Sequence, residues 1–222
     1  MLPRIVGAGL AAYLLGSIPP GIFWAWLFRH IDVRLHGSGR TGGTNVWRTA
    51  GFGAAVLTAL TDALKGAAAI WVAGVMGVPV WGVALAGALA IVGHNYSIFL
   101  GFHGGAGTAT SIGVAAALWT MSLAILPATL VVVGLLVGHA SVASITVALA
   151  LPVIFFLRGS VPEAVGFGLP TMALTLWALR PNIERLRRRA ERFLPVFKNK
   201  PPLIHLSDHP ADRRNRAKVA AS

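Results

Sequence analysis

The chain has 222 residues, of which 55% are hydrophobic and 12% are charged, a composition that excludes an ordinary water-soluble domain and favours a bilayer-embedded protein. The formal net charge is +12, but the cations are concentrated in two segments, so we expect no nucleic-acid partner. Positions 29–50 hold four Arg residues against one acid, and positions 180–222 hold twelve Lys or Arg against four acids. Cysteine is absent, which excludes disulfides and Cys-based metal or haem sites.

Long apolar runs predict the membrane spans. A helix needs roughly 20 apolar residues to cross a hydrocarbon core of about 30 Å. The runs that meet or approach this length are 5–28, 53–76, 80–100, 112–137, 142–157 and 164–179. The first run is too long for the apolar core of a signal peptide and lacks a cleavage site, so we expect it to stay in the protein.

The distribution of Lys and Arg predicts the orientation, because these residues resist translocation across the membrane. Loop 29–51 and tail 180–222 then share the cytoplasmic side, which requires an even number of crossings between them. Only five apolar runs separate them, so we expect 112–137 to break at Pro127, leaving a short fifth span at about 128–140. The sequence therefore predicts an all-α polytopic membrane protein of about seven transmembrane helices, with its N-terminus outside and its C-terminus cytoplasmic.

The same pattern predicts the domain organisation. Residues 1–197 form one transmembrane helical domain, and residues 198–222 form a basic, Pro-rich tail that we expect to be disordered and to touch anionic lipid headgroups. Between the last span and the tail, a basic amphipathic segment starts at Arg180 and is expected to lie at the cytoplasmic interface.

Two loops on the predicted cytoplasmic side are rich in Gly, Ser and Thr. Gly permits tight turns in which successive N–H groups converge on an anion, and hydroxyl and guanidinium groups add further donors. The first loop lacks the strand–loop–helix context and the terminal Gly-Lys-Ser/Thr of a nucleotide P-loop, so that motif is excluded. The two loops are His36-Gly37-Ser38-Gly39-Arg40-Thr41-Gly42-Gly43-Thr44-Asn45-Val46-Trp47-Arg48 and His103-Gly104-Gly105-Ala106-Gly107-Thr108-Ala109-Thr110-Ser111.

Charged groups inside the second apolar run are a further candidate site. Asp62 and Lys65 are three residues apart, which places them on one helix face where they can neutralise each other. Intramembrane charges face the bundle interior and mark functional sites, although a purely structural ion pair is the alternative. His94 is a weaker candidate, and no two His residues have the spacing of a helical metal site.

Two later polar groups complete the candidate set. Ser141 and Ser144 interrupt an apolar region, where they either bind a ligand or merely bond their own backbone. Asn182 and the neighbouring Arg residues could close over a phosphate held by the first loop.

These segments together resemble the bacterial acyl-phosphate-dependent glycerol-3-phosphate acyltransferases, over nearly the whole membrane portion. The segments that carry the resemblance are Leu15-Gly16-Ser17-Ile18-Pro19, His36-Gly37-Ser38-Gly39, Gly43-Thr44-Asn45-Val46-Trp47-Arg48, Asp62-Ala63-Leu64-Lys65-Gly66, Gly93-His94, Gly104-Gly105, Gly107-Thr108-Ala109-Thr110-Ser111, Ser141 to Ser144 and Asn182-Ile183-Glu184-Arg185-Leu186. The resemblance implies transfer of a fatty acyl group from acyl phosphate to glycerol 3-phosphate in phospholipid synthesis, at the cytoplasmic face of a bacterial inner membrane. It also implies no metal and no organic cofactor, and membrane lipids as surroundings.

The resemblance further implies roles for single residues. Ser38, Arg48 and Asn182 are the expected catalytic residues, and Asp62 with Lys65 is the charged pair near the site. The expected substrate-binding residues are Arg40, Thr44, Asn45, Gly104, Gly105, Gly107, Thr110, Ser141, Ser144 and Arg185.

Two positions depart from the family pattern. The second motif usually has Lys where this chain has Ala106, and the first usually has Asn where this chain has Arg40. Loss of a cation that faces two phosphates should cost several kcal/mol of binding or transition-state stabilisation. Our hypothesis is that Arg40 supplies the missing charge, because an Arg fork suits phosphate well.

Two other functions stay open on the sequence alone. Ala106 is compatible with a catalytically silent or altered relative that binds a lipid or phosphate compound without acyl transfer. A small transporter would use Asp62 and Lys65 as a coupling pair, although no inverted repeat is detectable.

Overall fold

The computed structural model describes residues 1–197, and its regular elements are helical, which confirms the all-α prediction. The predicted tail 198–222 lies outside the described residues. The helices are α1 (Leu2–Ser17), α2 (Pro20–Arg29), α3 (Gly43–Ala50), α4 (Phe52–Val75), α5 (Val80–Asn95), α6 (Thr108–Leu118), α7 (Ser122–Val137), α8 (Ala140–Leu157), α9 (Val161–Glu163) and α10 (Leu169–Arg187). Short turns are η1 (Val33–Leu35), η2 (Ile98–Leu100), the π-helical η3 (Ala164–Gly168) and η4 (Pro195–Phe197).

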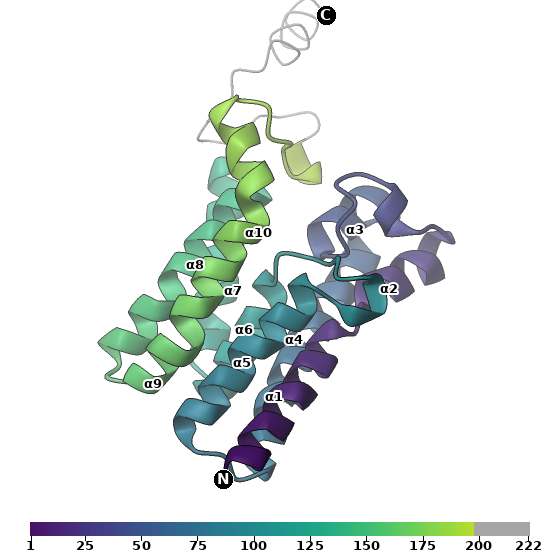
Figure 1. Ribbon diagram of the computed structural model, residues 1–222. Helices are drawn as coiled ribbons and strands as arrows, with labels where there is room; N and C mark the ends of the chain where they lie inside the picture. The colour runs from purple at the N-terminus through teal and green to yellow at the C-terminus, as the bar shows by residue number, and fades with distance from the viewer. Residues whose placement is uncertain (198–222) are drawn as a thin grey trace, which may run out of the picture.

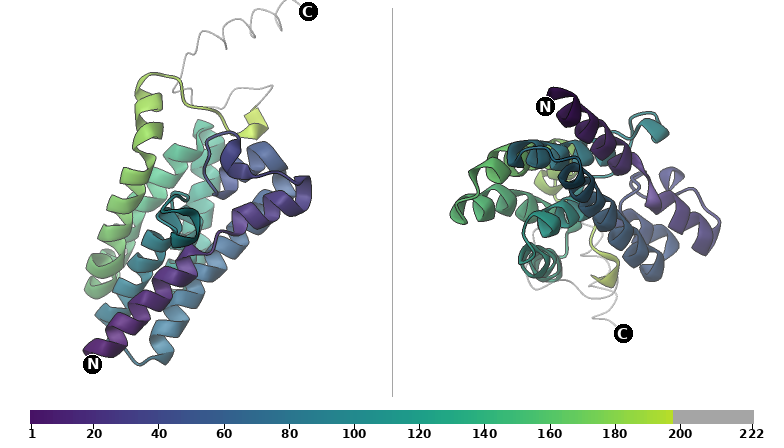
Figure 2. Two further views of the ribbon diagram at one scale, coloured as in Figure 1. Left: turned by 45° about the vertical axis from the view of Figure 1, so that its right-hand side comes forward. Right: turned by 90° about the horizontal axis from the view of Figure 1, so that it is seen from below.

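The long helices run side by side in one bundle, and both polar loops lie toward one end of it. Helix α1 packs on α4 and α5, α4 packs on α6, and α8 packs on α7 and α10. Figures 1 and 2 show α3 and the C-terminal end of α10 at the same end of the bundle, with the N-terminus at the opposite end. The fold therefore gathers segments that are far apart in the sequence at one end.

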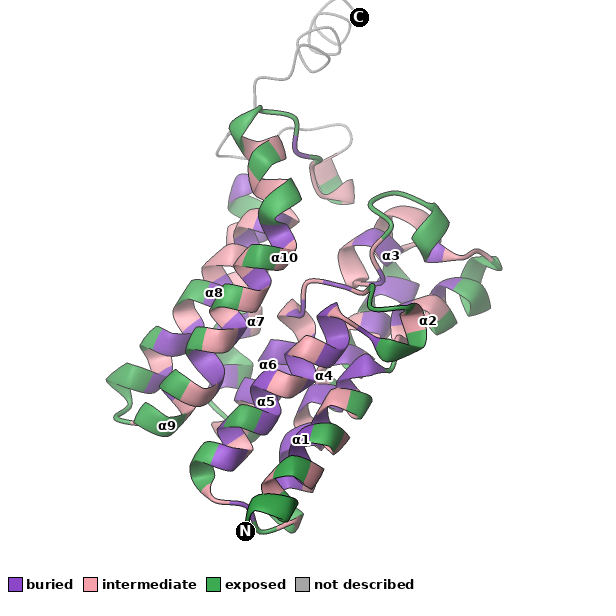
Figure 3. Cartoon of the chain, in the orientation of Figure 1, coloured by how far each residue is buried: buried purple, intermediate pink, exposed green. Residues whose placement is uncertain are grey.

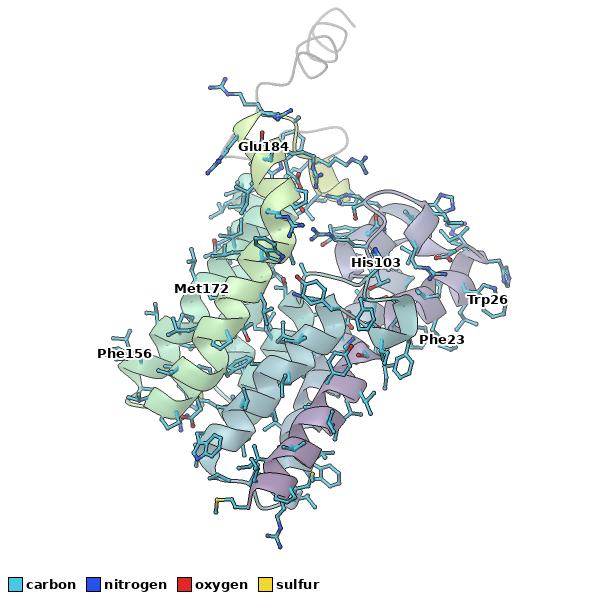
Figure 4. All side chains as sticks on the ribbon, viewed as in Figure 1. Phe23, Trp26, His103, Phe156, Met172 and Glu184 are labelled. Atoms are coloured by element: carbon cyan, nitrogen blue, oxygen red, sulfur yellow. The ribbon has the colours of Figure 1, made fainter. Side chains whose placement is uncertain are left out.

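Large apolar side chains cover the outside of the bundle, as expected for a protein that faces lipid. Phe23, Trp26 and Phe156 are all more than half exposed, and Figure 4 shows them projecting outward from the bundle. Figure 3 shows buried residues concentrated along the inner faces of α4 and α5. By length and composition, the stretches Leu2–Arg29, Phe52–Val75 and Ala140–Leu157 can cross a membrane.

The first predicted span, 5–28, is interrupted rather than continuous. Helix α1 ends at Ser17 and α2 begins at Pro20, because Pro19 and Pro20 lack the N–H groups that would bond back to the preceding turn. The interruption leaves the Ile18 carbonyl outside the helical bonding pattern. The Nζ of Lys65 donates to this oxygen at 2.6 Å, so the carbonyl that the interruption frees becomes the acceptor for a buried ammonium group.

The predicted break at Pro127 is wrong. The chain turns instead between the end of α6 at Leu118 and the start of α7 at Ser122, and Pro127 lies inside α7. Pro127 falls in the second turn of that helix, where its missing N–H removes one internal bond and leaves the later ones intact. The short helix of this region is consequently α6, which has 11 residues, and not a fifth span at about 128–140.

The last helix is also longer than the predicted span 164–179. Helix α10 continues through Pro181 to Arg187, and it is preceded by the π-helical turn η3. The basic segment that starts at Arg180 therefore continues the last helix as far as Arg187. Asn182 and Arg185 lie on this extension, at the end of the bundle where Figure 1 also shows α3.

Glycines let the helices approach closely at two crossings. A Cβ on Gly66 of α4 would lie 2.3 Å from the backbone oxygen of Thr110 in α6, and one on Gly113 of α6 would lie 1.8 Å from the oxygen of Ala63 in α4. A Cβ on Gly93 of α5 would similarly lie 2.1 Å from the oxygen of Tyr13 in α1. Small residues of this kind set the spacing of helices in membranes.

We predict that Gly66→Ala destabilises the fold by about 1–3 kcal/mol, because its Cβ meets backbone that cannot move aside. Gly74→Ala is the matched control on the same helix, since nothing lies within 4 Å of its Cβ position. Thermal unfolding in detergent should show a lower midpoint for the first variant and an equal or higher one for the second. Equal loss in both would mean that the α4–α6 crossing does not depend on this contact.

Candidate functional site

The structure contains a cavity of about 570 Å³. Its walls are formed by the two polar loops, α7, α8, α10 and residues 191–196. Of the predicted site residues, those that line it are Ser38, Arg40, Thr44, Asn45, Arg48, Asp62, Gly105, Gly107, Ser141, Ser144 and Asn182. Four other predicted site residues do not line the cavity but each contacts a lining residue: Gly104, Thr110, Lys65 and Arg185. The structure therefore brings the three predicted polar regions together around one space.

Asn45 holds the first loop in shape. Its side chain is buried, its Nδ2 donates to the carbonyls of Val33 (3.1 Å), His36 (3.0 Å) and Arg40 (2.9 Å), and its Oδ1 accepts from the Ser38 N–H (2.8 Å). These contacts use the hydrogen-bonding capacity of the amide within the loop. Asn45 thus positions Ser38 and Arg40 through these hydrogen bonds, and its expected contact with a phosphate stays a prediction.

Two guanidinium groups face the cavity from this loop and from α3. Arg40 donates to the carbonyl of Ala178 in α10, and Arg48 lies 3.4 Å from the carbonyl oxygen of Phe193. Burial lowers the pKa of both groups from the ordinary value, and the nearby Arg185 lowers the pKa of Arg40 further. Arg keeps its proton under all such conditions, so both remain charged, and an anionic ligand would relieve the cost of their burial.

The second loop is folded tightly against His94 at the end of α5. The Gly105 N–H donates to the His94 carbonyl at 3.1 Å, and a Cβ on Gly104 would lie only 2.0 Å from that same oxygen. Gly107 has φ +83°, a conformation that side-chain-bearing residues rarely adopt. The three glycines therefore allow a compact turn that starts α6 beside the cavity.

A buried ionic cluster of Asp62, Lys65 and His94 lies next to this loop. The Oδ1 of Asp62 lies 2.9 Å from the Nζ of Lys65 and 3.2 Å from the Nδ1 of His94. The Thr110 hydroxyl also lies 3.2 Å from that Nδ1. The predicted pair of Asp62 and Lys65 is thus part of a larger group that joins α4, α5 and α6, and Lys65 extends it to Ile18 after α1.

Glu191 is a site residue that the sequence did not reveal. Its buried carboxylate accepts from Asn182 Nδ2 at 2.8 Å, from Arg185 Nε at 2.8 Å and from the Ser141 hydroxyl at 3.3 Å. The only signal in the sequence is an isolated acid within the basic run that follows α10. Glu191 links three predicted site residues, and thereby orients α10 relative to α8.

The segment after α10 forms part of the cavity wall. The Leu194 N–H donates to the Gly138 carbonyl at 2.7 Å, and Phe193 stacks on His139 with ring centroids 4.7 Å apart. Leu194 and Val196 contribute apolar surface to the cavity wall. The segment therefore covers the space between α3 and α8 with backbone and apolar groups.

The cavity has an apolar part as well as a cationic part. Phe52, Val56 and Ala59 line it from α4, and Leu130, Val131 and Leu135 line it from α7. A ligand that fills the whole space would combine an anionic head with a hydrocarbon chain.

Comparison with known proteins agrees with this geometry. A family model described as glycerol-3-phosphate acyltransferase matches residues 6–189. The chain belongs to this family. A glycerol-3-phosphate acyltransferase of Synechococcus sp. (strain JA-3-3Ab) is 40% identical over 185 residues, which cover 83% of this chain and 90% of the relative. The corresponding protein of Geobacter metallireducens is 41% identical over 181 residues, covering 81% and 92%.

Solved structures agree too. The crystal structure of PlsY (YgiH), an integral membrane glycerol 3-phosphate acyltransferase, in its glycerol 3-phosphate form has a TM-score of 0.78 and 33% identity, and covers 87% of this chain and 97% of that one. Its lysophosphatidic acid form has a TM-score of 0.76. The chain is therefore a bacterial membrane acyltransferase that acts on glycerol 3-phosphate, and neither the silent relative nor the transporter is favoured. Within residues 1–197, no group of three or more His, Asp or Glu side chains is placed to hold a metal ion.

We predict that Asn45→Asp destabilises the first loop, because a carboxylate cannot donate to the three carbonyls that the amide now serves. Loss of these bonds should cost about 1–3 kcal/mol and should abolish most activity by misplacing Ser38 and Arg40. Thermal unfolding and acyl transfer would be measured together. Thr49→Val on the same helix is the control, since its hydroxyl only bonds the Asn45 carbonyl at 2.8 Å; equal effects of both changes would contradict the role given to the amide.

Proposed function

We propose that this acyltransferase uses acyl phosphate as its donor, and transfers the acyl group to the 1-hydroxyl of glycerol 3-phosphate to give lysophosphatidic acid and inorganic phosphate. One observation carries the proposal: a single cavity joins two guanidinium groups and a glycine-rich turn to an apolar groove between α4 and α7. Both substrates are phosphates, and the donor also carries a hydrocarbon chain. The PlsY forms with glycerol 3-phosphate and lysophosphatidic acid support the acceptor and the product.

The chemistry needs little from the protein beyond placement and charge. Acyl phosphate is already activated, so the enzyme has to hold two anions close together and stabilise the developing oxyanion. Arg48 and Arg40 neutralise the phosphates, with hydroxyl groups of Ser38 and Thr44 as further donors. The loop around Gly105 lines the same cavity with small residues, which leaves room for these anions.

Residues of α8 and α10 on the opposite wall complete the binding of both substrates. Ser141 and Ser144 at the start of α8 hold acyl phosphate, and Asn182 with Arg185 closes on glycerol 3-phosphate. The Oδ1 of Asn182 is buried without a hydrogen-bond partner in the described part of the chain, so it can accept from a glycerol hydroxyl. Catalysis in this arrangement involves no metal, no organic cofactor and no acyl-enzyme.

We further propose a cytoplasmic placement of the site in the bacterial inner membrane. Seven crossings by α1 with α2, α4, α5, α6, α7, α8 and α10 put the N-terminus outside and the end of α10 inside, with residues 1–197 as one transmembrane domain. The excess of Arg in loop 29–51 and beyond Arg180 supports this orientation. Soluble glycerol 3-phosphate then reaches the cavity directly from the cytoplasm.

The direct test incubates purified protein with palmitoyl phosphate and glycerol 3-phosphate. We expect lysophosphatidic acid and inorganic phosphate in equal amounts, and no product with palmitoyl-CoA as the donor. An Arg48→Gln variant should lose at least about 100-fold in kcat/KM, because a charge-assisted phosphate contact contributes roughly 3 kcal/mol. Product formation from palmitoyl-CoA alone would contradict the proposed donor.

Arg40 replaces the cation that the family has at the position of Ala106. Both residues line the cavity, which supports the compensation hypothesis. We predict that Arg40→Ala raises the KM for at least one phosphate substrate by about 10- to 100-fold, in line with loss of one charged hydrogen bond. Arg34→Ala is the control, because its guanidinium pairs with Asp32 on the exposed side of the same loop. Unchanged substrate affinity in the Arg40 variant would exclude compensation.

A further inference from the structure

Helices α5 and α10 leave a groove of about 640 Å³ between them. Apolar and aromatic side chains form its wall, and none of them lines the substrate cavity. The proposed reaction gives this groove no part. Because apolar hollows bind the apolar part of a ligand, the groove can hold a hydrocarbon chain.

One face of each helix contributes to the groove. Leu85, Ala88 and Val92 follow one another at helical spacing on α5, and Ala173 and Trp177 do so on α10. Ala88 and Ala173 present only methyl groups, so the space between the larger side chains stays unfilled. The groove is therefore a continuous channel along the two helices.

The length of the groove matches one leaflet of a bilayer. Eleven residues separate Leu85 from Tyr96, the first and last lining residues of α5, which corresponds to a rise of about 16 Å. The hydrocarbon core is about 30 Å thick, so the groove runs through roughly half of it. Tyr96 and Trp177 close the groove at the end of the bundle that carries the polar loops, which we place in the cytoplasm.

A cation without an acidic partner marks this end of the groove. The exposed guanidinium of Arg180 lies 4.2 Å from the ring centroid of Trp177, and its Nη1 donates to the Trp177 carbonyl at 3.4 Å. Within residues 1–197 no acid pairs with Arg180, and Glu184, one turn further along α10, pairs with Arg188 instead. Stacking on the indole orients the guanidinium and leaves N–H donors for an anion.

The chemistry of the two ends defines the occupant. A ligand that fits has a hydrocarbon chain about as long as one leaflet is deep and an anionic group at the level of the membrane interface. Tyr96 and Trp177 are the residue types that lie at this level, and Arg near the cytoplasmic surface attracts anionic lipid headgroups. A soluble phosphate would leave the apolar channel unused.

We propose that this groove is a binding site for one anionic phospholipid of the cytoplasmic leaflet. One acyl chain lies between α5 and α10, and the headgroup phosphate pairs with Arg180. The site is separate from the substrate cavity, and the proposal does not depend on the acyl donor.

The test measures lipid retention by native mass spectrometry of the full chain in detergent. The protein receives equal amounts of phosphatidylglycerol and phosphatidylcholine with identical acyl chains, in the presence of saturating glycerol 3-phosphate. We expect one phosphatidylglycerol to be retained, with a preference of about fivefold over phosphatidylcholine, which is the contribution of one basic residue near an anionic headgroup.

Two variants separate the roles of the two ends. Arg180→Gln should reduce the preference to about one, because only the charge is lost. Ala173→Phe should reduce retention of both lipids, because its ring fills the channel from an exposed position. Arg158→Gln is the matched control, since this exposed Arg also stacks on an indole, that of Trp119 at 5.3 Å, but neither residue lines the groove.

Several results would overturn the proposal. Equal retention of both lipids by the wild type, or an unchanged preference in Arg180→Gln, would exclude the headgroup site. Displacement of the lipid by inorganic phosphate would assign the anion site to a soluble ligand, and loss of retention in Arg48→Gln would assign the lipid to the substrate cavity. If Ala173→Phe does not fold, the comparison of Arg180→Gln with Arg158→Gln decides.

Discussion

The architecture depends on how one carboxylate is accommodated inside an apolar bundle. Asp62 is 1% exposed in the middle of α4, and an isolated charge in such a place would be prohibitively costly. Lys65 and His94 provide its partners, and Lys65 in turn reaches the carbonyl that the Pro19–Pro20 interruption frees. The ion pair therefore fixes α4, α5, α6 and the end of α1 relative to one another, directly beneath the second loop.

The cavity above this cluster follows from close helix approach and from the extension of α10. Gly66 and Gly113 bring α4 and α6 together, so the glycine-rich turn before α6 lies beside the first loop. Glu191 then joins α10 to α8 through Asn182 and Ser141. The result is a cavity with half-buried guanidinium groups at one part and hydrocarbon walls at the other, which matches the substrates of a glycerol-3-phosphate acyltransferase.

Much of this could be predicted from the sequence, where the signal is local. The run 53–76 corresponds closely to α4 and 142–157 to α8, because uninterrupted apolar length determines a span. The sequence does not reveal the turn before Ser122, because Pro127 is the stronger local signal for a helix break. A proline near the start of a helix, as in α7, does not end that helix. Loop motifs located the cavity, but the internal bonding of Asn45 and the anchoring role of Glu191 arise from tertiary contacts that no local pattern encodes.

The central claim is that one cavity on the cytoplasmic face binds the phosphates of both substrates. The chain has no cysteine, so Ala106→Cys places a single thiol on the cavity wall. A membrane-impermeant maleimide should label it in inside-out vesicles, and glycerol 3-phosphate or palmitoyl phosphate at ten times its Kd should slow labelling about tenfold. Labelling only from the outer face, or labelling at a rate that neither substrate changes, would contradict the account.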